Sequence, residues 1–225
     1  MRDISVLFEE LVSQIDSTIT IKNKVGNVFN TCDTKWLRVG KKVWGLTLTN
    51  VLKETTVKTL IKDTSFELND NTIVKGIYIS SPFAIVGTKI ATNNEFILKS
   101  RNLLDKTPLI WLLESHNEKV YNLEASLERD IKMRIIFLDE TNVAQYKTTD
   151  HRLQVVEPMI SLQEEFIKVL NKKPIYKTLK DFNRNVFSRF GVESDKGVIQ
   201  NILDADLSGI VIEFTTSKFK EPCKC

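Results

Sequence analysis

Hydrophobic and polar positions repeat with a helical period at two places in the chain. Near the start, apolar side chains recur every three or four positions, at Ile4, Leu7, Phe8, Leu11, Val12 and Ile15. This spacing puts them on one face of a helix, so the sequence predicts an amphipathic N-terminal helix. A longer pattern of the same kind covers residues 151–171, where Pro158 predicts that the helix kinks or begins.

Between residues 18 and 96 the period changes to two. Apolar and polar residues alternate over 18–21, 44–49 and 57–60, and less cleanly over 74–79. Turn-forming residues separate these stretches, for example Gly26-Asn27 and Asn69-Asp70-Asn71. Short strands with such punctuation are typical of a small sandwich or barrel. We therefore predict a β-rich insertion over residues 18–96.

Three apolar runs without strict alternation lie in the second half, at 107–114, 131–140 and 208–216. Their β-branched and aromatic residues favour strands. Without the insertion, the order of elements is α-β-β-α-β. The predicted fold class is α+β: a mixed or antiparallel sheet with two helices on one face. Residues 1–17 and 97–225 would form this core domain.

Composition narrows the function classes. The net charge of +3 and the 27% of charged residues are too mild to indicate nucleic acid. No stretch of about 18 apolar residues occurs, so no membrane span is expected. The N-terminus lacks the pattern of a signal peptide. The three cysteines, Cys32, Cys223 and Cys225, are an odd number that favours a reducing compartment. We expect a soluble intracellular protein.

Candidate catalytic residues are few. His116 and His151 are the only histidines, and neither lies in a nucleophile motif. Cys223 and Cys225 lack a second pair of zinc ligands. A cluster of carboxylates could hold a hard cation, but these residue types are also common in turns: Glu193, Asp195, Asp204 and Asp206. We predict no catalytic, cofactor-binding or metal-binding residues and no enzyme; an unfamiliar hydrolase using these carboxylates is the third-ranked hypothesis.

Two clusters combine aromatic and basic residues. The first contains Trp36, Arg38, Lys41, Lys42 and Trp44, and the second contains Phe182, Arg184, Phe187, Arg189 and Phe190. Either could stack on bases and contact phosphates. The second has the composition of a protein–protein hot spot. We therefore predict that the second cluster is an assembly interface, and the first carries the alternative hypothesis of a nucleic-acid-binding module built on the β-rich insertion.

The order of elements resembles the tail-terminator and neck proteins of long-tailed bacteriophages. The resemblance rests on the N-terminal helix, a Pro-led strand at 107–112, a long strand at 132–138, a helix at about 155–170 and a closing strand at 209–214. Segments 81–95, 188–193 and 201–209 are also similar to phage structural proteins. The β-rich stretch departs from the simple family pattern.

This resemblance implies a structural subunit of a phage-like virion. It would form a ring, usually a hexamer, that caps the tail tube at the head–tail junction. The implied partners are other copies of the chain, the tail-tube protein and neck or connector proteins. The resemblance implies no cofactor and no membrane, with nucleic acid only passing through the ring. The subunit would assemble in the host cytoplasm and reside in the tail or neck of the virion.

Overall fold

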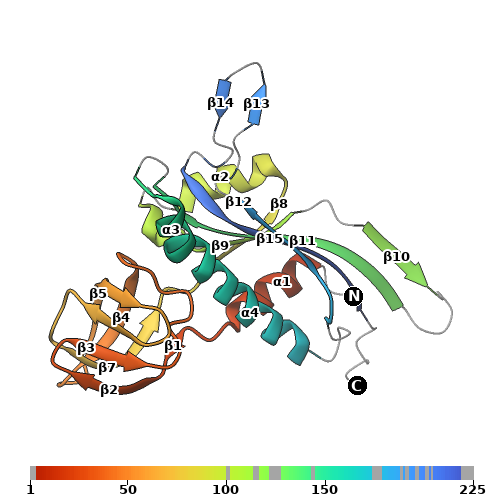
Figure 1. The fold of residues 1–225 in the computed structure, drawn as a ribbon. Coiled ribbons are helices and arrows are strands. Elements are labelled where there is room, and N and C mark those ends of the chain that lie inside the picture. Colours follow the sequence, from red (N-terminus) through yellow and green to blue (C-terminus); the bar gives the residue numbers. More distant parts are fainter. Residues whose placement is uncertain are drawn as a thin grey trace.

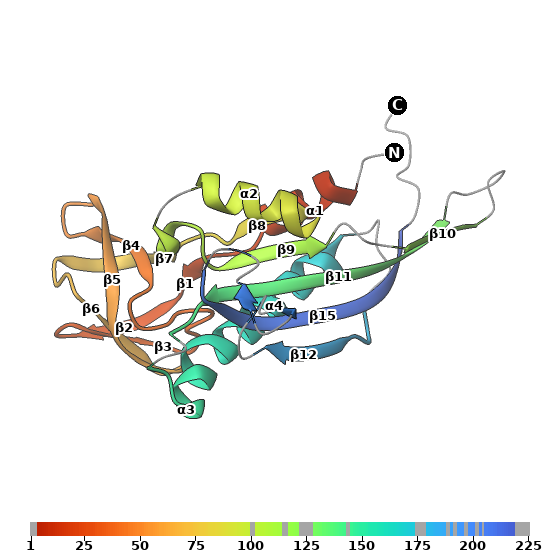
Figure 2. The same cartoon turned by 90° about the horizontal axis from the view of Figure 1, so that it is seen from above.

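The computed structural model of the chain describes residues 4–99, 102–113, 117–121, 128–142, 145–173, 179–187, 190, 193–195, 198–200, 203 and 205–218 (Figure 1). Within these residues the strands form two large sheets and one small hairpin. The two large sheets occupy opposite ends of an elongated molecule (Figure 2).

The first sheet has seven strands in the order β1-β7-β4-β5-β6-β3-β2. The strands are β1 (Thr18–Ile19), β2 (Ile21–Val25), β3 (Val28–Thr31), β4 (Lys42–Thr47), β5 (Leu52–Ile61), β6 (Ser65–Leu68) and β7 (Ile73–Ile79). Only Thr20 separates β1 from β2, and these two strands pair with β7 and β3 at opposite ends of the sheet. Because one stretch of chain joins both ends, the sheet is nearly closed into a barrel (Figure 1).

The interior of the barrel follows from the alternation in sequence. On β4, Val43 and Gly45 are buried while the residues between them are less so. Gly45 is required there because a Cβ would lie 2.3 Å from Cγ2 of Ile73. Opposite them, Phe29 and Phe66 stack with their ring centroids 5.3 Å apart. One apolar face per strand is enough to fill a small barrel.

The second sheet has six strands in the order β12-β15-β11-β9-β8, with β10 also paired to β11. The strands are β8 (Phe83–Gly87), β9 (Leu109–Leu113), β10 (Asn117–Tyr121), β11 (Glu128–Glu140), β12 (Asn183–Phe187) and β15 (Leu207–Lys218). All pairs are antiparallel except β8 with β9. The two longest strands, β11 and β15, pair along almost their whole length, and β10 extends away from the body of the molecule (Figures 1 and 2).

Both faces of this sheet are covered, which explains its continuous apolar runs. On one face, Ile110 and Phe137 join the apolar core that contains α1 (Ile4–Ser13) and α4 (Glu157–Lys172). On the other face, Trp111 joins a separate core that contains Phe96 of α2 (Lys89–Lys99). Successive residues of β9 and β11 therefore enter different cores.

Aromatic contacts align the helices with the sheet. The ring of Phe166 in α4 lies 5.9 Å from that of Phe8 in α1 and 5.8 Å from that of Phe137 in β11. The helix that contains Phe166 begins at Glu157, with Pro158 in its first turn, as the sequence indicated. It is preceded by α3 (Thr148–His151) and the π-helical turn η2 (Arg152–Val156).

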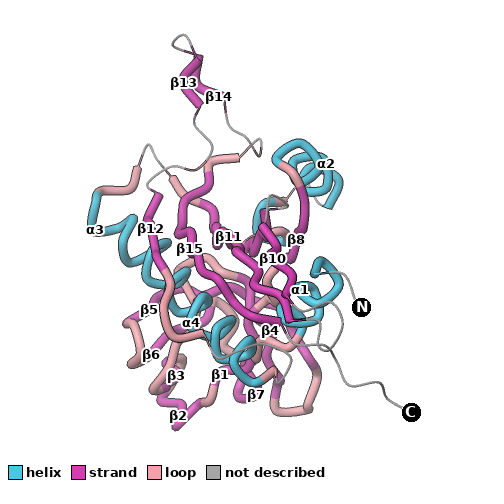
Figure 3. Tube along the Cα trace, turned by 90° about the vertical axis from the view of Figure 1, so that its right-hand side faces the viewer, coloured by secondary structure: helices cyan, strands magenta, loops and turns pink. Residues whose placement is uncertain are grey.

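Two shorter features complete the fold. The 3-10 turn η1 (Leu103–Asp105) precedes β9. The hairpin of β13 (Glu193–Asp195) and β14 (Val198–Gln200) projects from one end of the molecule (Figure 3).

The predicted α+β class, with two helices on one face of a single sheet, is wrong. In the part of the chain that the structure describes, strands dominate and form a nearly closed seven-stranded sheet beside a six-stranded one. A third helix, α2, packs on the opposite face of the second sheet from α1 and α4. The α-β-β-α-β order omitted β8, β10 and β12, which have five residues each and no long apolar run, and it left out α2, although the capping residues at 92–95 indicate a short helix there.

The boundary between the two sheets also differs from the expected one at residues 96 and 97. β8 and α2 lie within the proposed insertion, 18–96, yet β8 pairs with β9 in the second sheet. The first sheet ends at Ile79, so the stretch inserted after α1 comprises residues 18–79. The parallel pairing of β8 with β9 depends on the helix α2 between them, which acts as a crossover connection.

Candidate functional site

The predicted interface cluster lies at one edge of the six-stranded sheet. β12 pairs with β15 from Asn183 opposite Glu213 to Phe187 opposite Gly209. No strand among the described residues pairs with the outer side of β12. Val186, in the middle of the strand, is 54% exposed. β12 is therefore an open edge, a kind of surface on which another strand can add.

The five predicted residues do not form one surface. Phe187 and Phe190 are partly buried against the core that contains Trp111, and the Phe190 ring lies 5.9 Å from that indole. Arg184 donates from Nη1 to Oε1 of buried Gln163 in α4, at 3.1 Å. Phe182 is exposed, and Arg189 lies outside the described residues. Two of the three phenylalanines of this cluster therefore pack against the core instead of lying on the surface.

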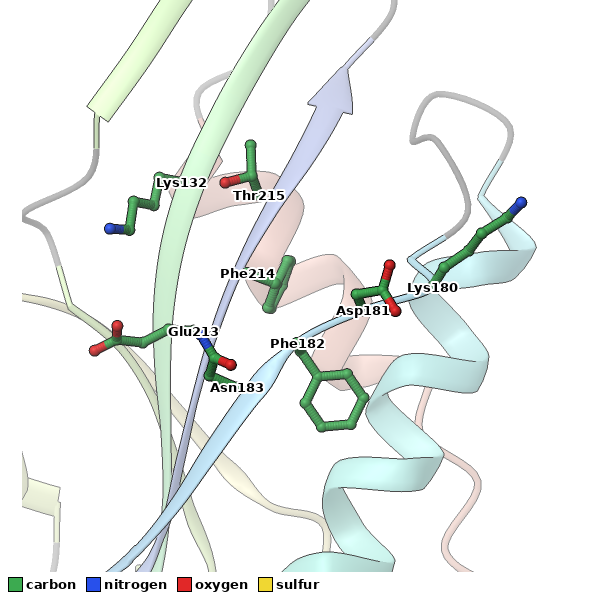
Figure 4. Close-up of a pocket in the computed structure, with 8 residues that line it drawn as sticks. All are labelled: Lys132, Lys180, Asp181, Phe182, Asn183, Glu213, Phe214 and Thr215. Atoms are coloured by element: carbon green, nitrogen blue, oxygen red, sulfur yellow. The ribbon is translucent and has the colours of Figure 1, made fainter.

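An open hollow of about 580 Å³ adjoins the start of β12 (Figure 4). It is lined by Lys132, Lys180, Asp181, Phe182, Asn183, Glu213, Phe214 and Thr215. These side chains comprise two cations, two carboxylates, two aromatic rings and two neutral polar groups. Such a mixed lining next to an open strand edge suits a polypeptide better than a phosphate or a metal ion, which select one sign of charge.

The second notable cluster is buried at the junction between the two sheets. Arg38, from the loop between β3 and β4, donates from Nε and Nη2 to the two carboxylate oxygens of Asp139 at 3.0 and 3.2 Å. Its Nη2 also contacts Glu140 Oε2 at 3.1 Å. Both acids stand at the end of β11. This bidentate pair fixes the barrel to the sheet in one orientation.

Lys41 lies in the same cluster. Its Nζ donates to the backbone oxygen of Thr107 and is 3.9 Å from Oδ1 of Asp139. Burial lowers the pKa of Lys41 to about 8, against the opposing attraction of Asp139. Burial raises the pKa of Asp139, but the charges of Arg38 and Lys41 outweigh it and hold that pKa at about 2. Arg38 and Lys41 thus share the buried carboxylate of Asp139, and Arg38 also contacts the partly exposed Glu140.

Further polar contacts join the barrel to the rest of the chain, with the cation on the barrel in each case. Lys42 Nζ lies 2.6 Å from Asp105 Oδ1 in η1. Lys62 donates to Ser161 Oγ of α4 at 2.9 Å. The junction is therefore polar and matched in charge, and its central pair is excluded from water.

Most of the first aromatic and basic cluster is buried at this junction. Trp36 and Lys41 are 0% exposed and Arg38 is 4% exposed. These residues were the proposed nucleic-acid surface, but they face the interior and the second sheet. Of that cluster, only Lys42 and Trp44 remain partly exposed, and Lys42 is paired with Asp105. The alternative function therefore lacks the surface on which it depended.

The remaining candidates do not assemble into a reactive centre in the described residues. No group of three or more His, Cys, Asp or Glu side chains there could hold a metal ion. Burial lowers the pKa of His151, whose Nε2 has no hydrogen-bond partner in the same part of the chain. Cys32 is exposed and not in a disulfide. His116, Asp204, Cys223 and Cys225 lie outside the described residues.

Sequence reasoning missed the pairing of Arg38 with Asp139. The only local signal was an aspartate at the end of a long apolar run, directly before Glu140. A carboxylate in that position more often marks the exposed end of a strand. The partner is 101 residues away, so no spacing rule could have identified it.

Comparisons with protein-family models, with curated proteins and with solved structures found no match to this chain. Among the described residues, no helix has both the length and the apolar character needed to cross a membrane.

Proposed function

We propose that this chain is a structural subunit of a phage-like virion that forms a ring at the head–tail junction and caps the tail tube, as a tail terminator or neck protein. The resemblance in the order of elements is one support. The main support is the open edge of β12, which has exposed side chains and no strand paired to its outer side among the described residues.

An open edge of this kind favours assembly. Natural proteins usually protect exposed strands with charge, proline or covering loops, because an unprotected strand recruits another chain. β12 carries Arg184, two asparagines and an exposed valine, and it has no proline. The hollow beside it could take side chains of an added strand. A contact that joins different surfaces on two copies generates a ring when its rotation closes.

In this proposal the partners are further copies of the chain, the tail-tube protein and neck or connector proteins. The site of action is the tail or neck of the virion, after assembly in the host cytoplasm. Binding surfaces do the work, and no catalytic step or cofactor is involved. Nucleic acid would only pass through the centre of the ring.

The proposal is tested by the mass and shape of the purified full chain. We expect light scattering to give a multiple of the subunit mass at tens of micromolar, and negative-stain images to show rings. Val186→Asp should reduce the assembled fraction at least tenfold. The matched control is Val25→Asp on β2 of the barrel, where the valine is 64% exposed. A wild-type chain that stays monomeric, with no rings on the grid, contradicts the proposal.

A further inference from the structure

The barrel has a place where strand pairing is missing. β1 pairs with β7 only through Thr18 and Ile19, and after Thr20 the chain continues as β2, which pairs with β3. β2 and β7 remain neighbours, but no backbone pairing joins them in the part of the chain that the structure describes (Figure 1). We call the contact between residues 21–25 and residues 71–76 the seam. Over this length the barrel is not closed by a ladder of backbone hydrogen bonds.

The conformation of β7 explains why the pairing stops. Gly76 has a φ of +61°, in the left-handed region that favours glycine. On the β4 side, Tyr78 is opposite Trp44, whereas Lys75 is opposite Leu46. Three steps along β7 therefore match two steps along β4, which is the arrangement of a β-bulge. Because a bulge bends its strand and interrupts the ladder, the pairing that begins at β1 does not continue along β2.

A lysine side chain bridges the seam in place of the ladder. Nζ of Lys24, on β2, donates to the backbone oxygen of Ile73 at 2.7 Å and to that of Asn71 at 3.3 Å. The same ammonium lies 5.0 Å from the centre of the Phe29 ring, which is a cation–π distance. A charged donor makes stronger hydrogen bonds than a neutral amide. Lys24 therefore supplies across the seam the attachment that backbone amides supply elsewhere in the barrel.

The acceptors of this lysine are held in place from the other side. Asp70 forms an ion pair with Lys53 of β5, whose Nζ lies 2.5 Å from Oδ2. Oδ1 of Asp70 accepts from the amide of Thr72 at 2.8 Å, and the amide of Asp70 donates to Thr55 Oγ1 at 3.1 Å. These contacts fix the turn that contains Asn71 to β5. Among the described residues, the hydrogen bonds from the β2 lysine are the only ones that cross from β2 to this fixed side of the seam.

We propose that Lys24 is a clasp and that the barrel opens at the seam when this clasp releases. A segment opens locally where few backbone hydrogen bonds hold it and where solvent reaches those bonds. The side chain of Lys24 is only partly buried, so water competes for its ammonium group, whereas Phe29 and Ile73 beside it are buried. Opening therefore admits water to the apolar interior and leaves β2 paired on one side only. This property belongs to the barrel and does not depend on the proposed function.

Amide hydrogen exchange of the full wild-type chain at low urea concentrations tests whether the seam opens by itself. Local opening exposes little surface, so exchange through it depends weakly on urea, whereas exchange through complete unfolding depends steeply on urea. We expect the amides of residues 21–25 to exchange by local opening. The amides of residues 43–46 lie in a strand that is paired on both sides, and we expect them to exchange by complete unfolding. Equal urea dependence in the two strands overturns the proposal.

Substitutions test whether Lys24 is the clasp. Lys24→Met keeps an aliphatic stem beside Phe29 and removes the charged donor, so residues 21–25 should exchange about tenfold faster or more, still with weak urea dependence. Lys24→Arg keeps a charged donor and should retain most of the protection. Lys22→Met, at an exposed position of the same strand, is the control and should exchange like the wild-type chain. Wild-type exchange in Lys24→Met, or equal acceleration in Lys22→Met, overturns the proposal. Circular dichroism shows whether each variant is folded, and the urea dependence of the wild-type chain decides the proposal if Lys24→Met is not.

Discussion

The barrel and the six-stranded sheet are both built from β-strands, but their edge strands are arranged differently. The barrel is nearly closed because only Thr20 separates its two edge strands, β1 and β2, although these strands are not paired with each other in the described residues. The six-stranded sheet buries both faces and leaves β12 at an edge. Closure makes a unit that is complete by itself, whereas an open sheet has strand edges that can pair with another chain. We therefore expect another chain to pair with the sheet edge at β12 rather than with the barrel.

The two sheets meet at a junction of charged side chains. Arg38 and Lys41 reach from the barrel to Asp139 on the open sheet, and all three are buried. Buried ion pairs add little net stability but fix geometry, and they are costly to break from one side. Substitutions at this junction are therefore expected to lower the free energy of unfolding more than substitutions elsewhere in either sheet.

The largest effect is expected for Asp139→Ala. The substitution leaves Lys41 desolvated without an anion and Arg38 with only the partly exposed Glu140, so the free energy of unfolding should fall by about 3–5 kcal/mol. Urea unfolding followed by tryptophan fluorescence measures it. The control is Asp105→Ala, which removes the partly exposed partner of Lys42 and should cost less than about 1 kcal/mol. Equal losses in the two variants would show that the buried pair does not hold the sheets together.

The next effect is a pH dependence of the junction. Lys41 has an ordinary pKa of 10.5 when unfolded and about 8 when folded. Between these values the unfolded chain binds more protons, so the free energy of unfolding rises as the pH goes from 8 to 10.5. The rise attributable to Lys41 is at most about 3.5 kcal/mol, at about 1.4 kcal/mol per pKa unit.

Lys41→Met isolates this contribution from the titration of other groups. The variant should lose the rise between pH 8 and 10.5, because position 41 then carries no group that titrates. The measurement is urea unfolding at a series of pH values for both proteins. Parallel pH curves for the two chains would rule out a buried, titrating Lys41.

A glycine-to-alanine substitution, which adds one methyl group, is expected to have different effects in the two sheets. At Gly209 in β15 a Cβ would lie 1.9 Å from the backbone oxygen of Phe137, whereas at Gly45 in the barrel it meets side-chain atoms of Ile73 and Ile77. Backbone of a central strand cannot move as side chains can. Gly209→Ala should therefore cost up to about 3 kcal/mol and Gly45→Ala about 1 kcal/mol. Thermal unfolding of both variants compares them, and the reverse order would mean that the barrel is the more rigid unit.

The smallest effects are expected on the solvated surfaces, where the two sheets should behave alike. Lys58 and Glu67 pair at 3.0 Å on the barrel, and Arg134 and Glu213 pair at 3.1 Å on the open sheet. Removing either cation should change the free energy of unfolding by about 0.2–1 kcal/mol, and 1 M salt should erase the difference. A loss well above this range on one sheet would reveal a network around that pair.

Local patterns were enough to predict several elements. The helical spacing of Leu7, Phe8 and Leu11 predicted α1, and Pro158 marked the first turn of α4. The alternation around Trp44 and the apolar run that includes Phe137 predicted β4 and β11. In these elements the apolar positions of the local sequence pattern are the positions that are buried.

The fold class and the site could not be read in the same way. Ile85 lies in a short strand whose identity depends on pairing with β9. Phe187 and Phe190 appeared to be surface residues only because their core partner, Trp111, is far away in sequence. Long-range pairing decides these positions, and a single sequence does not specify it.

The path by which the chain enters and leaves the barrel has a consequence for its history. Thr18 is paired with Tyr78, and the amide of Ile79 donates to the oxygen of Ser17 at 2.9 Å. The two crossing points are hydrogen-bonded neighbours, so residues 18–79 form a cassette that could be acquired or deleted without rerouting the rest of the chain. Asp139 sets the condition for such an exchange. Deletion of residues 18–79 during evolution would leave the Asp139 carboxylate without Arg38 and Lys41. We would then expect an apolar residue in place of Asp139.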